Sequence, residues 1–503
     1  MASPSEKLAA SLAALRELQQ ADVVAIRSTD LSRTHRERLI KNGFLQEVMK
    51  GWYVSARPDE DRGESTAWYT SFWGFCAAYL SDRFDSDWSL SPEQSLFLHT
   101  GNWTVPRQLL VRTPKGGNKP TQLPHKTSIF DVRASLPARG QAAIIENLRV
   151  FSLPASLVQI GTGMYRENAI DVRTALAMTG DASEVLSILL DGGHSIVAGR
   201  LAGAFRNIGR DKIADEIIKG MKAADYVVKE TDPFKEASAL ILRTREPSPY
   251  VTRIRLMWRD MRESIIEVFP EPPTKKIEIE TYLKNVDDVF VTDAYHSLSI
   301  EGYRVSEALI EKIRDGNWDP QNDDEDRDHR NALAARGYLD AFQAVKGSVK
   351  KVLQGKNAGD VVDDDHREWY RGLFAPGVTA GILRPGDLAG YRNGPVYIRQ
   401  SMHVPPPKEA VRDLMPAFFD LLRKEEHPAV RNVLGHFIFV YIHPYLDGNG
   451  RMGRFLMNVM MASGGYPWTV ITVEKRDEYM SALEQASVEK NIVPFATYLA
   501  NLL

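Results

Sequence analysis

The chain holds one short stretch whose residue types could carry out acid–base chemistry beside a phosphate. This stretch, HPYLDGNGRMGR, runs from residue 443 to residue 454. His443 titrates near neutrality, so its imidazole can take a proton from an attacking hydroxyl group. Asp447 supplies a hard oxygen ligand of the kind that a magnesium ion bridging phosphate oxygens prefers. The two side chains predict a general base and a metal ligand within one loop.

The rest of the stretch has the properties of a phosphate cradle. Gly448 and Gly450, with Asn449 between them, let backbone amides approach an anion without obstruction by a side chain. A helix that begins here adds free N–H groups and the positive end of its dipole. Arg451 and Arg454 lie near one another on its first turn and can grip successive phosphates. A lone GNG is an ordinary tight turn, but the combination favours catalysis.

Two apolar segments must position this loop. The segment before it, VRNVLGHFIFVYI (residues 430–442), is apolar almost all round toward its end, as in a buried helix. The segment after it, RFLMNVMMAS (residues 454–463), predicts a second helix. We therefore expect the loop to join two core helices in a region that is nearly all helical beyond residue 275. Acidic runs at residues 319–329 and 360–366 are expected to be solvated loops.

The stretch resembles the signature His-Pro-Phe-x-(Asp/Glu)-Gly-Asn-Gly-Arg-x-x-Arg of the Fic family, helical enzymes that transfer AMP from ATP onto a hydroxyl side chain of a target protein. The resemblance covers roughly residues 275 to 503, with Tyr445 replacing phenylalanine at a packing position. It implies a general base at His443, a Mg²⁺ ligand at Asp447, an anion hole at Gly448, Asn449 and Gly450, and triphosphate binding by Arg451 and Arg454.

A second segment, SLSIEG, matches the inhibitory pattern Ser/Thr-x-x-x-Glu-Gly/Asn of the same family. It runs from Ser297 to Gly302 and ends a helical run, where Gly302 suits a helix C-terminus. The resemblance implies that Glu301 pairs with Arg454, the cation that should hold the γ-phosphate, so that ATP binds in an unproductive pose. In some family members the same glutamate positions water to remove AMP, so net addition and net removal both stay open.

A third segment has the position and character of the hairpin flap with which Fic enzymes align a target backbone by strand addition. It is GPVYIRQSMHVPPP, residues 394–407, with a strand-like alternation closed by three prolines. The residues expected to pair with a target are Val396, Tyr397 and Ile398. An ordinary hairpin that covers the core is the alternative interpretation.

The N-terminal segment LSRTHRERLIKNGFLQEVMKGWYV predicts a helix, capped by Asp30 or Ser32 and followed by a two-stranded wing around Lys50 and Gly51. It resembles the winged-helix head of AbiEi-like type IV antitoxins, and residues 60–235 loosely resemble the domain that follows there, with strands at RQLLVRT and AAIIENLRVFS. DNA contacts would then come from Arg33, Arg36, Arg38 and Lys41. A winged helix that contacts protein is the alternative.

Composition sets broad limits on partners and location. The formal net charge of the 503 residues is only −3, so global charge predicts no partner. The only cysteine, Cys76, excludes a disulfide framework within the chain and fits a reducing compartment. No segment has the apolar length of a signal peptide or a membrane span. We therefore expect a cytoplasmic protein that does not contact a membrane, and we leave self-association open.

These observations predict a multidomain fold. We expect a winged helix-turn-helix at residues 1–58, a mixed α/β domain at 59–245, and an all-α Fic domain with its inhibitory helix and β-hairpin flap at 246–503. The predicted function is a protein adenylyltransferase that uses ATP and Mg²⁺, restrained by Glu301. The alternative is a DNA-binding, antitoxin-like regulator whose Fic domain senses nucleotide or removes AMP. The sequence does not fix ATP over another nucleoside triphosphate.

Overall fold

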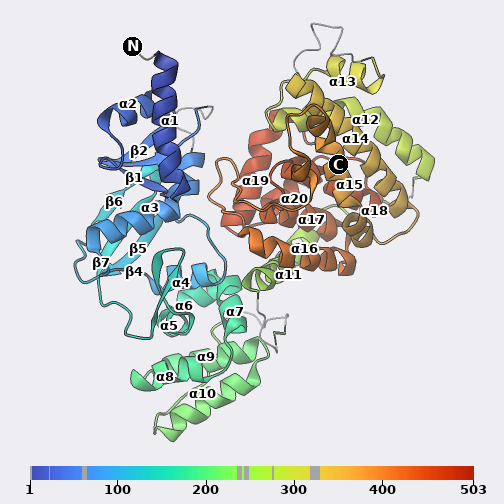
Figure 1. Ribbon diagram of the computed structural model, residues 1–503. Coiled ribbons are helices and arrows are strands. Elements are labelled where there is room, and N and C mark those ends of the chain that lie inside the picture. Colours follow the sequence, from blue (N-terminus) through green and yellow to red (C-terminus); the bar gives the residue numbers. More distant parts are fainter. Residues whose placement is uncertain are drawn as a thin grey trace. The chain divides into compact units, whose positions relative to one another are not determined.

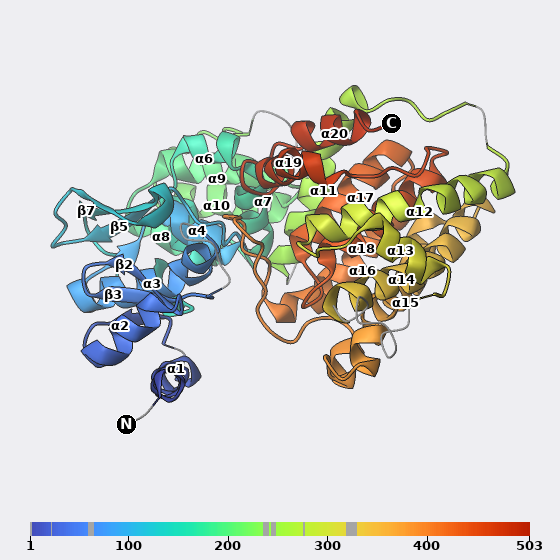
Figure 2. The same ribbon diagram turned by 90° about the horizontal axis from the view of Figure 1, so that it is seen from above.

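The computed structural model describes residues 3–21, 23–58, 65–234, 241–242, 248–274, 277–317 and 329–503 (Figures 1 and 2). The chain forms two compact units. Unit 1 comprises Met1–Arg253 and Tyr397–Val404, and unit 2 comprises Ile254–Val396 and Pro405–Leu503. The change of unit at residue 253 lies close to the predicted boundary at 245, while the predicted division at residue 58 lies inside unit 1 and stays a prediction.

The N-terminal part of unit 1 is a small helical and antiparallel layer. Its elements are α1 (Pro4–Gln20), β1 (Ala25–Arg27), α2 (Arg33–Lys41), β2 (Leu45–Met49) and β3 (Trp52–Ser55), with strand order β1-β3-β2. The side chain of Ser32, not that of Asp30, caps α2 by accepting from the His35 N–H. The predicted wing is present as the hairpin of β2 and β3, and its identification as a winged helix stays a prediction.

The next part of unit 1 builds a mixed sheet against an aromatic helix. The helices are α3 (Thr66–Phe84), α4 (Pro92–His99) and η1 (Pro124–Lys126), and the strands are β4 (Ser89–Leu90), β5 (Gln108–Thr113), β6 (Pro120–Gln122), β7 (Ser128–Arg133), β8 (Ala142–Ile145) and β9 (Leu148–Phe151). The strand order is β4-β5-β7-β6, with β5 and β7 parallel. Both predicted strand segments are confirmed, and β8 and β9 form a hairpin through Glu146 and Asn147, whose φ angles are 47° and 66°.

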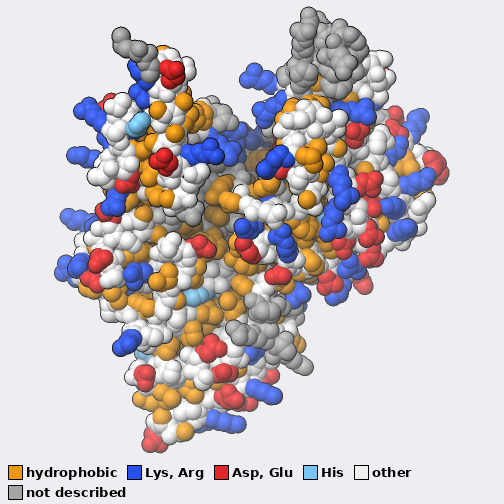
Figure 3. Space-filling view, in the orientation of Figure 1, with side chains coloured by type: hydrophobic (Ala, Val, Ile, Leu, Met, Phe, Trp, Pro, Cys, Tyr) orange, Lys and Arg blue, Asp and Glu red, His pale blue; other side chains and the backbone are white. Residues whose placement is uncertain are grey.

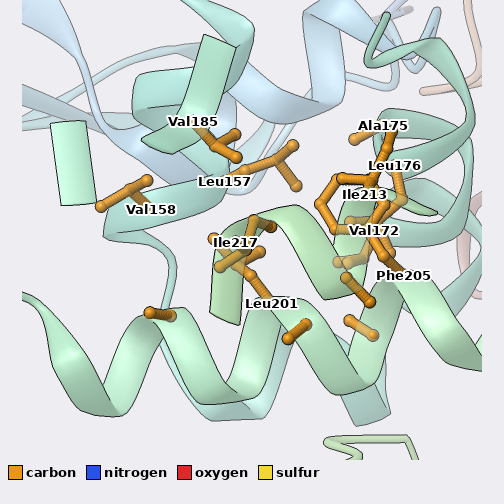
Figure 4. Close-up of a cluster of buried hydrophobic side chains, with 14 of the residues drawn as sticks. Leu157, Val158, Val172, Ala175, Leu176, Val185, Leu201, Phe205, Ile213 and Ile217 are labelled. Carbon is orange, nitrogen blue, oxygen red and sulfur yellow. The ribbon is translucent and has the colours of Figure 1, made fainter. Parts of the chain in front are cut away.

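The last part of unit 1 is a helical layer with its own apolar core (Figure 4). It contains α5 (Leu153–Gln159), α6 (Thr162–Glu167), α7 (Ala169–Met178), α8 (Ser183–Asp191), α9 (Ser195–Asn207) and α10 (Asp211–Ala223). On α10 the buried residues Ile213, Ile217 and Met221 recur every fourth position, so they share one face. That face packs against Leu201 and Phe205 of α9 in the same cluster.

Unit 2 is all helical within the part of the chain that the structure describes. Its elements are α11 (Pro249–Val268, which begins in unit 1), α12 (Ile279–Ile300), α13 (Glu307–Arg314), α14 (His329–Leu353), α15 (Ala358–Thr379), η3 (Pro385–Leu388), α16 (Lys408–Lys424), α17 (Pro428–Ile442), α18 (Asn449–Ser463), η4 (Val473–Lys475), α19 (Arg476–Val488) and α20 (Val493–Ala500). None of the described helices in either unit combines the length and apolarity needed to cross a bilayer.

The helices α17 and α18 are the buried core helices expected on either side of the signature loop. Nearly every residue from Asn432 to Ile442 is buried, and α18 is buried from Arg451 to Ala462. His436 of α17 ties the two helices to a third, because Nδ1 lies 2.9 Å from the Gly453 carbonyl oxygen and Nε2 lies 2.8 Å from the Tyr479 hydroxyl. The loop between α17 and α18 is therefore held at both ends by buried helices.

One predicted acidic loop is a helix instead. Residues 360–366 form the first turns of α15, which Asn357 caps. Asp360 and Asp363 pair with Arg423, and Asp365 accepts hydrogen bonds from Ser348 and Lys351. Carboxylates near a helix N-terminus are stabilised by its dipole, so the acidic run starts the helix rather than interrupting it. The other predicted acidic loop lies almost entirely outside the described residues.

The predicted β-hairpin flap is also wrong as secondary structure. The described segment from residue 393 to residue 407 has no strand. Pro395 and the prolines at 405–407 remove backbone donors that a ladder needs. The Met402 carbonyl instead accepts from the Val105 N–H at 2.9 Å, and Met402 and Val404 pack against the aromatic cluster of unit 1. Strand addition by Val396, Tyr397 and Ile398 stays a proposal.

The apolar core of α9 yields a stability prediction. Leu201 is fully buried, so Leu201→Ala should lower the free energy of unfolding of unit 1 by about 2–5 kcal/mol through lost transfer energy and a residual cavity. Ile196 on the same helix is 84% exposed, so Ile196→Ala should change it by less than about 0.5 kcal/mol. Guanidinium unfolding followed by circular dichroism measures both, and equal losses for the two variants would contradict this packing.

Candidate active site

His443 stands at the C-terminal end of α17 with its basic nitrogen available. It is the helix C-cap in the left-handed conformation, with φ 54° and ψ 60°, and its N–H donates to the Phe439 carbonyl. Nδ1 lies 3.1 Å from the Val440 carbonyl oxygen and donates to it, so the neutral ring carries its lone pair at Nε2. Burial lowers the pKa of His443 to about 4. The ring is therefore unprotonated at neutral pH and can accept a proton.

The loop after His443 is held by the Asn449 side chain. Its Oδ1 accepts from the Tyr445 N–H and its Nδ2 donates to the Tyr445 carbonyl, each at 2.9 Å. Tyr445 is fully buried and stacks on Tyr370 with ring centroids 4.0 Å apart, as expected of a packing position. Gly448 has φ 80°, and an added Cβ there would lie 2.8 Å from the Phe374 ring. Both its conformation and its surroundings require glycine.

The N-terminus of α18 is the predicted anion cradle, and the Glu301 carboxylate lies beside it. Gly448 is the N-cap, so the first-turn N–H groups of α18 lack helical partners. A Cβ placed on Gly450 would overlap Glu301 Oε1 and lie 3.2 Å from Arg454 Nη1. The Glu301 carboxylate therefore lies beside the Cα of Gly450 on the first turn of α18. Gly450 is the residue that permits this approach.

Arg454 and Glu301 form the ion pair that the inhibitory pattern predicts. Arg454 Nη2 lies 2.6 Å from Glu301 Oε1, and the two side chains are 4% and 25% exposed. Arg454 Nε also donates to Ser297 Oγ at 2.9 Å, and Nη2 to the Ser297 carbonyl at 3.1 Å. Burial opposes the charge on Glu301, but Arg454 and Arg451 outweigh it and hold the pKa of Glu301 below its usual value. The pair is therefore ionised at neutral pH.

Arg451 is enclosed by two aromatic rings. Its guanidinium carbon lies 5.3 Å from the Tyr303 ring centroid and 5.1 Å from that of Phe374. Nη2 makes a long contact of 3.4 Å with Asp447 Oδ2. Within the described part of the chain, Arg451 Nε and Arg454 Nη1 are buried donors with no hydrogen-bond partner. Buried guanidinium donors without acceptors are the groups that a phosphate would satisfy.

The end of α12 fixes Glu301 in this place. The Gly302 N–H donates to the Ser299 carbonyl and the Tyr303 N–H to the Leu298 carbonyl, which is a Schellman ending with Gly302 at φ 85°. Arg476 Nε donates to the Ile300 carbonyl at 3.1 Å. Figure 2 shows α12 running beside α18, as the bonds between Ser297 and Arg454 require. The Glu301 side chain thus stands at a helix end that hydrogen bonds hold in place.

Asp447 fits the role of a ligand for a metal ion that phosphate oxygens also bind. Its side chain is 64% exposed; Oδ1 accepts from the Gly448 N–H, and Oδ2 lies 3.4 Å from Arg451 Nη2. Among the described residues, no group of three or more His, Cys, Asp or Glu side chains could hold a metal alone. One carboxylate together with phosphates and water is the usual arrangement for Mg²⁺ at nucleotide sites.

The structure brings most predicted site residues together and adds two. His443, Asp447, the glycines, both arginines and the Ser297–Gly302 segment meet at the N-terminus of α18, whereas Tyr397 and Ile398 belong to unit 1. Sequence reasoning missed Tyr303 and Phe374, the two rings on Arg451. Tyr303 directly follows the inhibitory pattern, which is the only local signal that could have indicated it.

Some of the residues predicted to contact DNA make hydrogen bonds within unit 1. Arg36 Nη1 donates to the Ser28 carbonyl at 2.6 Å, and Arg38 Nη1 to the Lys7 carbonyl at 2.7 Å. Arg33 pairs with Glu37 at 2.7 Å on the surface, and Lys41 is exposed. On the face shown in Figure 3, lysine and arginine side chains are scattered among acidic and apolar ones.

Comparison with known proteins identifies the domain around the loop. Residues 364–461 match the Fic/DOC family, so the C-terminal region carries a Fic domain. A protein adenylyltransferase Fic from Nematostella vectensis is 28% identical over 232 residues, which is 45% of this chain and 48% of that protein. One from Drosophila willistoni is 27% identical over 276 residues, or 53% of this chain and 49% of that protein. The chain thus spans about half the length of these curated relatives.

Among solved structures, part of Fic-1 from C. elegans aligns with 68% of this chain and 94% of that chain, at 22% identity and a TM-score of 0.37. A superposition this loose carries no conclusion about the present chain.

The low pKa of His443 yields a prediction that can be tested without an activity assay. In NMR titration of the intact protein, the His443 ring should titrate well below the usual 6.5, near the value of about 4 that burial imposes. The unfolded chain binds this proton at higher pH, so the contribution of His443 to stability should fall as pH drops from 6.5 toward 4. The signal is identified by its loss in His443→Ala, and a midpoint above 6 would show that the ring is solvated.

Proposed function

We propose that the Fic domain transfers AMP from ATP to a hydroxyl side chain of a protein, and that Glu301 restrains this reaction. The observation that carries the proposal is the Glu301 carboxylate over the first turn of α18, paired with Arg454 at 2.6 Å. A helix N-terminus flanked by two buried arginines is a site for an anion larger than one carboxylate. The name protein adenylyltransferase, borne by the curated relatives, supports AMP transfer as the chemistry.

In the proposed reaction, the target hydroxyl loses its proton to His443 Nε2 while its oxygen attacks the α-phosphorus of ATP. A phosphodiester bond to AMP forms, the bond to the β-phosphate breaks, and pyrophosphate leaves with the electron pair. The Nδ1 bond to Val440 holds the ring so that Nε2 faces the reaction. Bound Mg²⁺, held by Asp447, would neutralise charge on the phosphate oxygens.

The low proton affinity of His443 is compatible with this role. A pKa of about 4 makes the ring a weak base, but it is fully unprotonated at neutral pH. Phosphoryl transfer passes through a loose transition state in which the attacking oxygen has formed little bond. The hydroxyl therefore needs orientation more than early deprotonation, and a fixed Nε2 provides an acceptor for the proton when it becomes acidic.

The arginines explain how one carboxylate can restrain the site. Arg454 Nη1 and Arg451 Nε are buried donors that lack partners in the described residues. With Glu301 in place, Arg454 Nη2 and the surface above Gly450 are taken, so the terminal phosphate of ATP has to bind elsewhere. The α-phosphorus then lies out of line with a hydroxyl near His443. Removing the carboxylate should restore the productive pose.

Labelling with α-³²P-ATP and Mg²⁺ tests both parts of the proposal. Wild type should label itself and lysate proteins weakly. Glu301→Gly should label them at least about tenfold more strongly because Arg454 is released. The double variant Glu301→Gly, His443→Ala should produce no label. Glu301→Gln, which removes only the charge, should label at an intermediate level. Glu489→Gly is the matched control, because Glu489 is the C-cap of α19 and its loss should leave the wild-type level.

The outcomes separate the two parts. Strong labelling by wild type, with no increase in Glu301→Gly, would refute the restraint but keep AMP transfer. Absence of label in every variant would refute AMP transfer from ATP.

AMP removal is a second candidate, favoured by the electrostatic coupling between Glu301 and His443, which places a second carboxylate near the base. In that case wild type should release AMP from a protein premodified by Glu301→Gly, and Glu301→Gly should not. Replacing ATP by other nucleoside triphosphates in the labelling experiment tests the choice of nucleotide.

DNA binding by the N-terminal unit is the remaining proposal, favoured by the order helix, strand, helix and hairpin. Wild type should retard its own upstream DNA with an affinity that falls as salt rises. The double variant Arg33→Glu, Lys41→Glu should weaken this shift at least about tenfold, while Lys350→Glu in unit 2 should not. No retardation at low salt would exclude DNA as the partner of this unit.

A further inference from the structure

A buried arginine outside the signature grips the peptide of His443. The Arg392 side chain is 2% exposed, and its Nε donates to the His443 carbonyl at 2.8 Å. Its own backbone N–H donates to the Pro444 carbonyl at 2.9 Å. The chain around Arg392 therefore holds two successive carbonyls at the place where α17 ends in the left-handed conformation. His443 enters that conformation without the freedom of glycine, so these bonds stabilise a strained position.

The same guanidinium also bonds both ends of residues 394–406. Its Nη1 donates to the Gly394 carbonyl at 3.2 Å, and its Nη2 donates to the Pro406 carbonyl. Nη2 also lies 3.5 Å from the Ile442 carbonyl, at the last residue of α17. One side chain thus joins the end of the catalytic helix to both ends of residues 394–406, where the sequence predicts the flap.

Among the described residues, the acceptors that the Arg392 guanidinium bonds are backbone carbonyls, and a cation among them suits the end of α17. Carbonyls at a helix C-terminus lack helical donors and carry the negative end of the dipole. Burial lowers the pKa of Arg392 to about 10, so the group remains charged at neutral pH. A buried charge without a paired carboxylate destabilises the folded protein. Such a charge is typically retained where it serves a function.

We propose that Arg392 is the positioning residue for His443, and that it sets the direction of the imidazole and its distance from the Gly394 and Pro406 carbonyls. The inference rests on the proposed role of His443 as the base. Arg392 touches neither the nucleotide cradle nor the reacting atoms. It acts through the His443 carbonyl and through the two carbonyls at the base of the segment.

The charge on Arg392 adds an electrostatic effect to the geometric one. The charged groups that act on the imidazole are Arg392, Glu301 and Asp447. Burial is the main cause of the lowered pKa of His443; Arg392 adds to the lowering, while Glu301 and Asp447 oppose it. Loss of the guanidinium should therefore make the ring easier to protonate. A purely structural arginine would not change this titration.

The test compares Arg392→Gln and Arg392→Lys with Arg431→Gln. Arg431 is the matched control, since it bonds the Glu425 carbonyl and Ser463 at the opposite end of α17. NMR titration of His443 is measured in the wild-type background. The kcat and the KM for ATP are measured in the Glu301→Gly background.

Arg392→Gln should raise the pKa of His443 by up to about one unit and lower kcat about 10- to 100-fold. The KM for ATP should stay within about twofold, because the phosphate-binding residues are untouched. Arg392→Lys should keep the charge and hence the wild-type titration, but lose part of kcat because an ammonium cannot reach all the carbonyls. Arg431→Gln should change neither the titration nor kcat.

Three results would overturn the proposal. The first is an unchanged His443 titration and kcat in Arg392→Gln, and the second is an equal response of Arg431→Gln. The third is a fall in kcat matched by an equal rise in KM. If Arg392→Gln does not fold, Arg392→Lys tests the proposal instead. This variant should lose part of kcat while the pKa of His443 stays at the wild-type value. If Glu301→Gly transfers no AMP, the proposed function fails, whereas the titration still tests the grip of Arg392 on His443.

Discussion

The first turn of α18 presents backbone N–H groups that no helical carbonyl can accept, and the positive end of its dipole faces outward at the same point. Such a turn favours a nearby anion, and the surrounding residues leave room for one. Gly448 allows the turn into the helix, and Gly450 leaves room for a close oxygen. The side chain of Asn449 ties the loop back on itself so that the amides keep their direction. In this structure the carboxylate of Glu301 lies beside that turn and pairs with Arg454.

Three buried arginines surround the loop, and each is stabilised differently. Arg454 has a carboxylate and the Ser297 hydroxyl, Arg451 lies between two aromatic rings, and Arg392 has carbonyls. These environments match different tasks. A cation paired with a removable carboxylate can be released for a phosphate, whereas a cation held by carbonyls of the main chain cannot leave. The first kind suits binding and the second suits support.

The sequence predicted the site best where its chemistry is contiguous. Twelve neighbouring residues hold the proposed base, the proposed cradle and both arginines, and helix periodicity correctly predicted the flanking core helices. Glu301, more than 140 residues away, was found because its pattern matches the family's inhibitory motif. Phe374 and Arg392 had no such signal, because their roles arise from packing between distant helices. Tyr303 was also missed, although it directly follows the inhibitory motif in the sequence.

The errors in the sequence-based predictions also have physical causes. The acidic residues 360–366 looked like a solvated loop, yet Arg423, Ser348 and Lys351 give their carboxylates partners along α15. The alternation in residues 394–407 predicted a hairpin, but prolines deprive it of donors and the aromatic core of unit 1 takes Met402 and Val404. Arg36 and Arg38 were predicted to contact DNA; their guanidinium groups bond carbonyls of their own unit, and DNA contact by these residues stays a prediction.

The Schellman ending of α12 makes Glu301 a ligand that the protein carries at a fixed position. The proposed competition of Glu301 with the terminal phosphate of ATP would be governed by an effective concentration, which is about millimolar for a short flexible tether and higher for a rigid one in register. Diluting the protein leaves that effective concentration unchanged. The restraint in the proposed resting state is therefore a property of each single molecule. It is relieved only when the end of α12 moves or when another anion displaces the Glu301 carboxylate by binding more tightly.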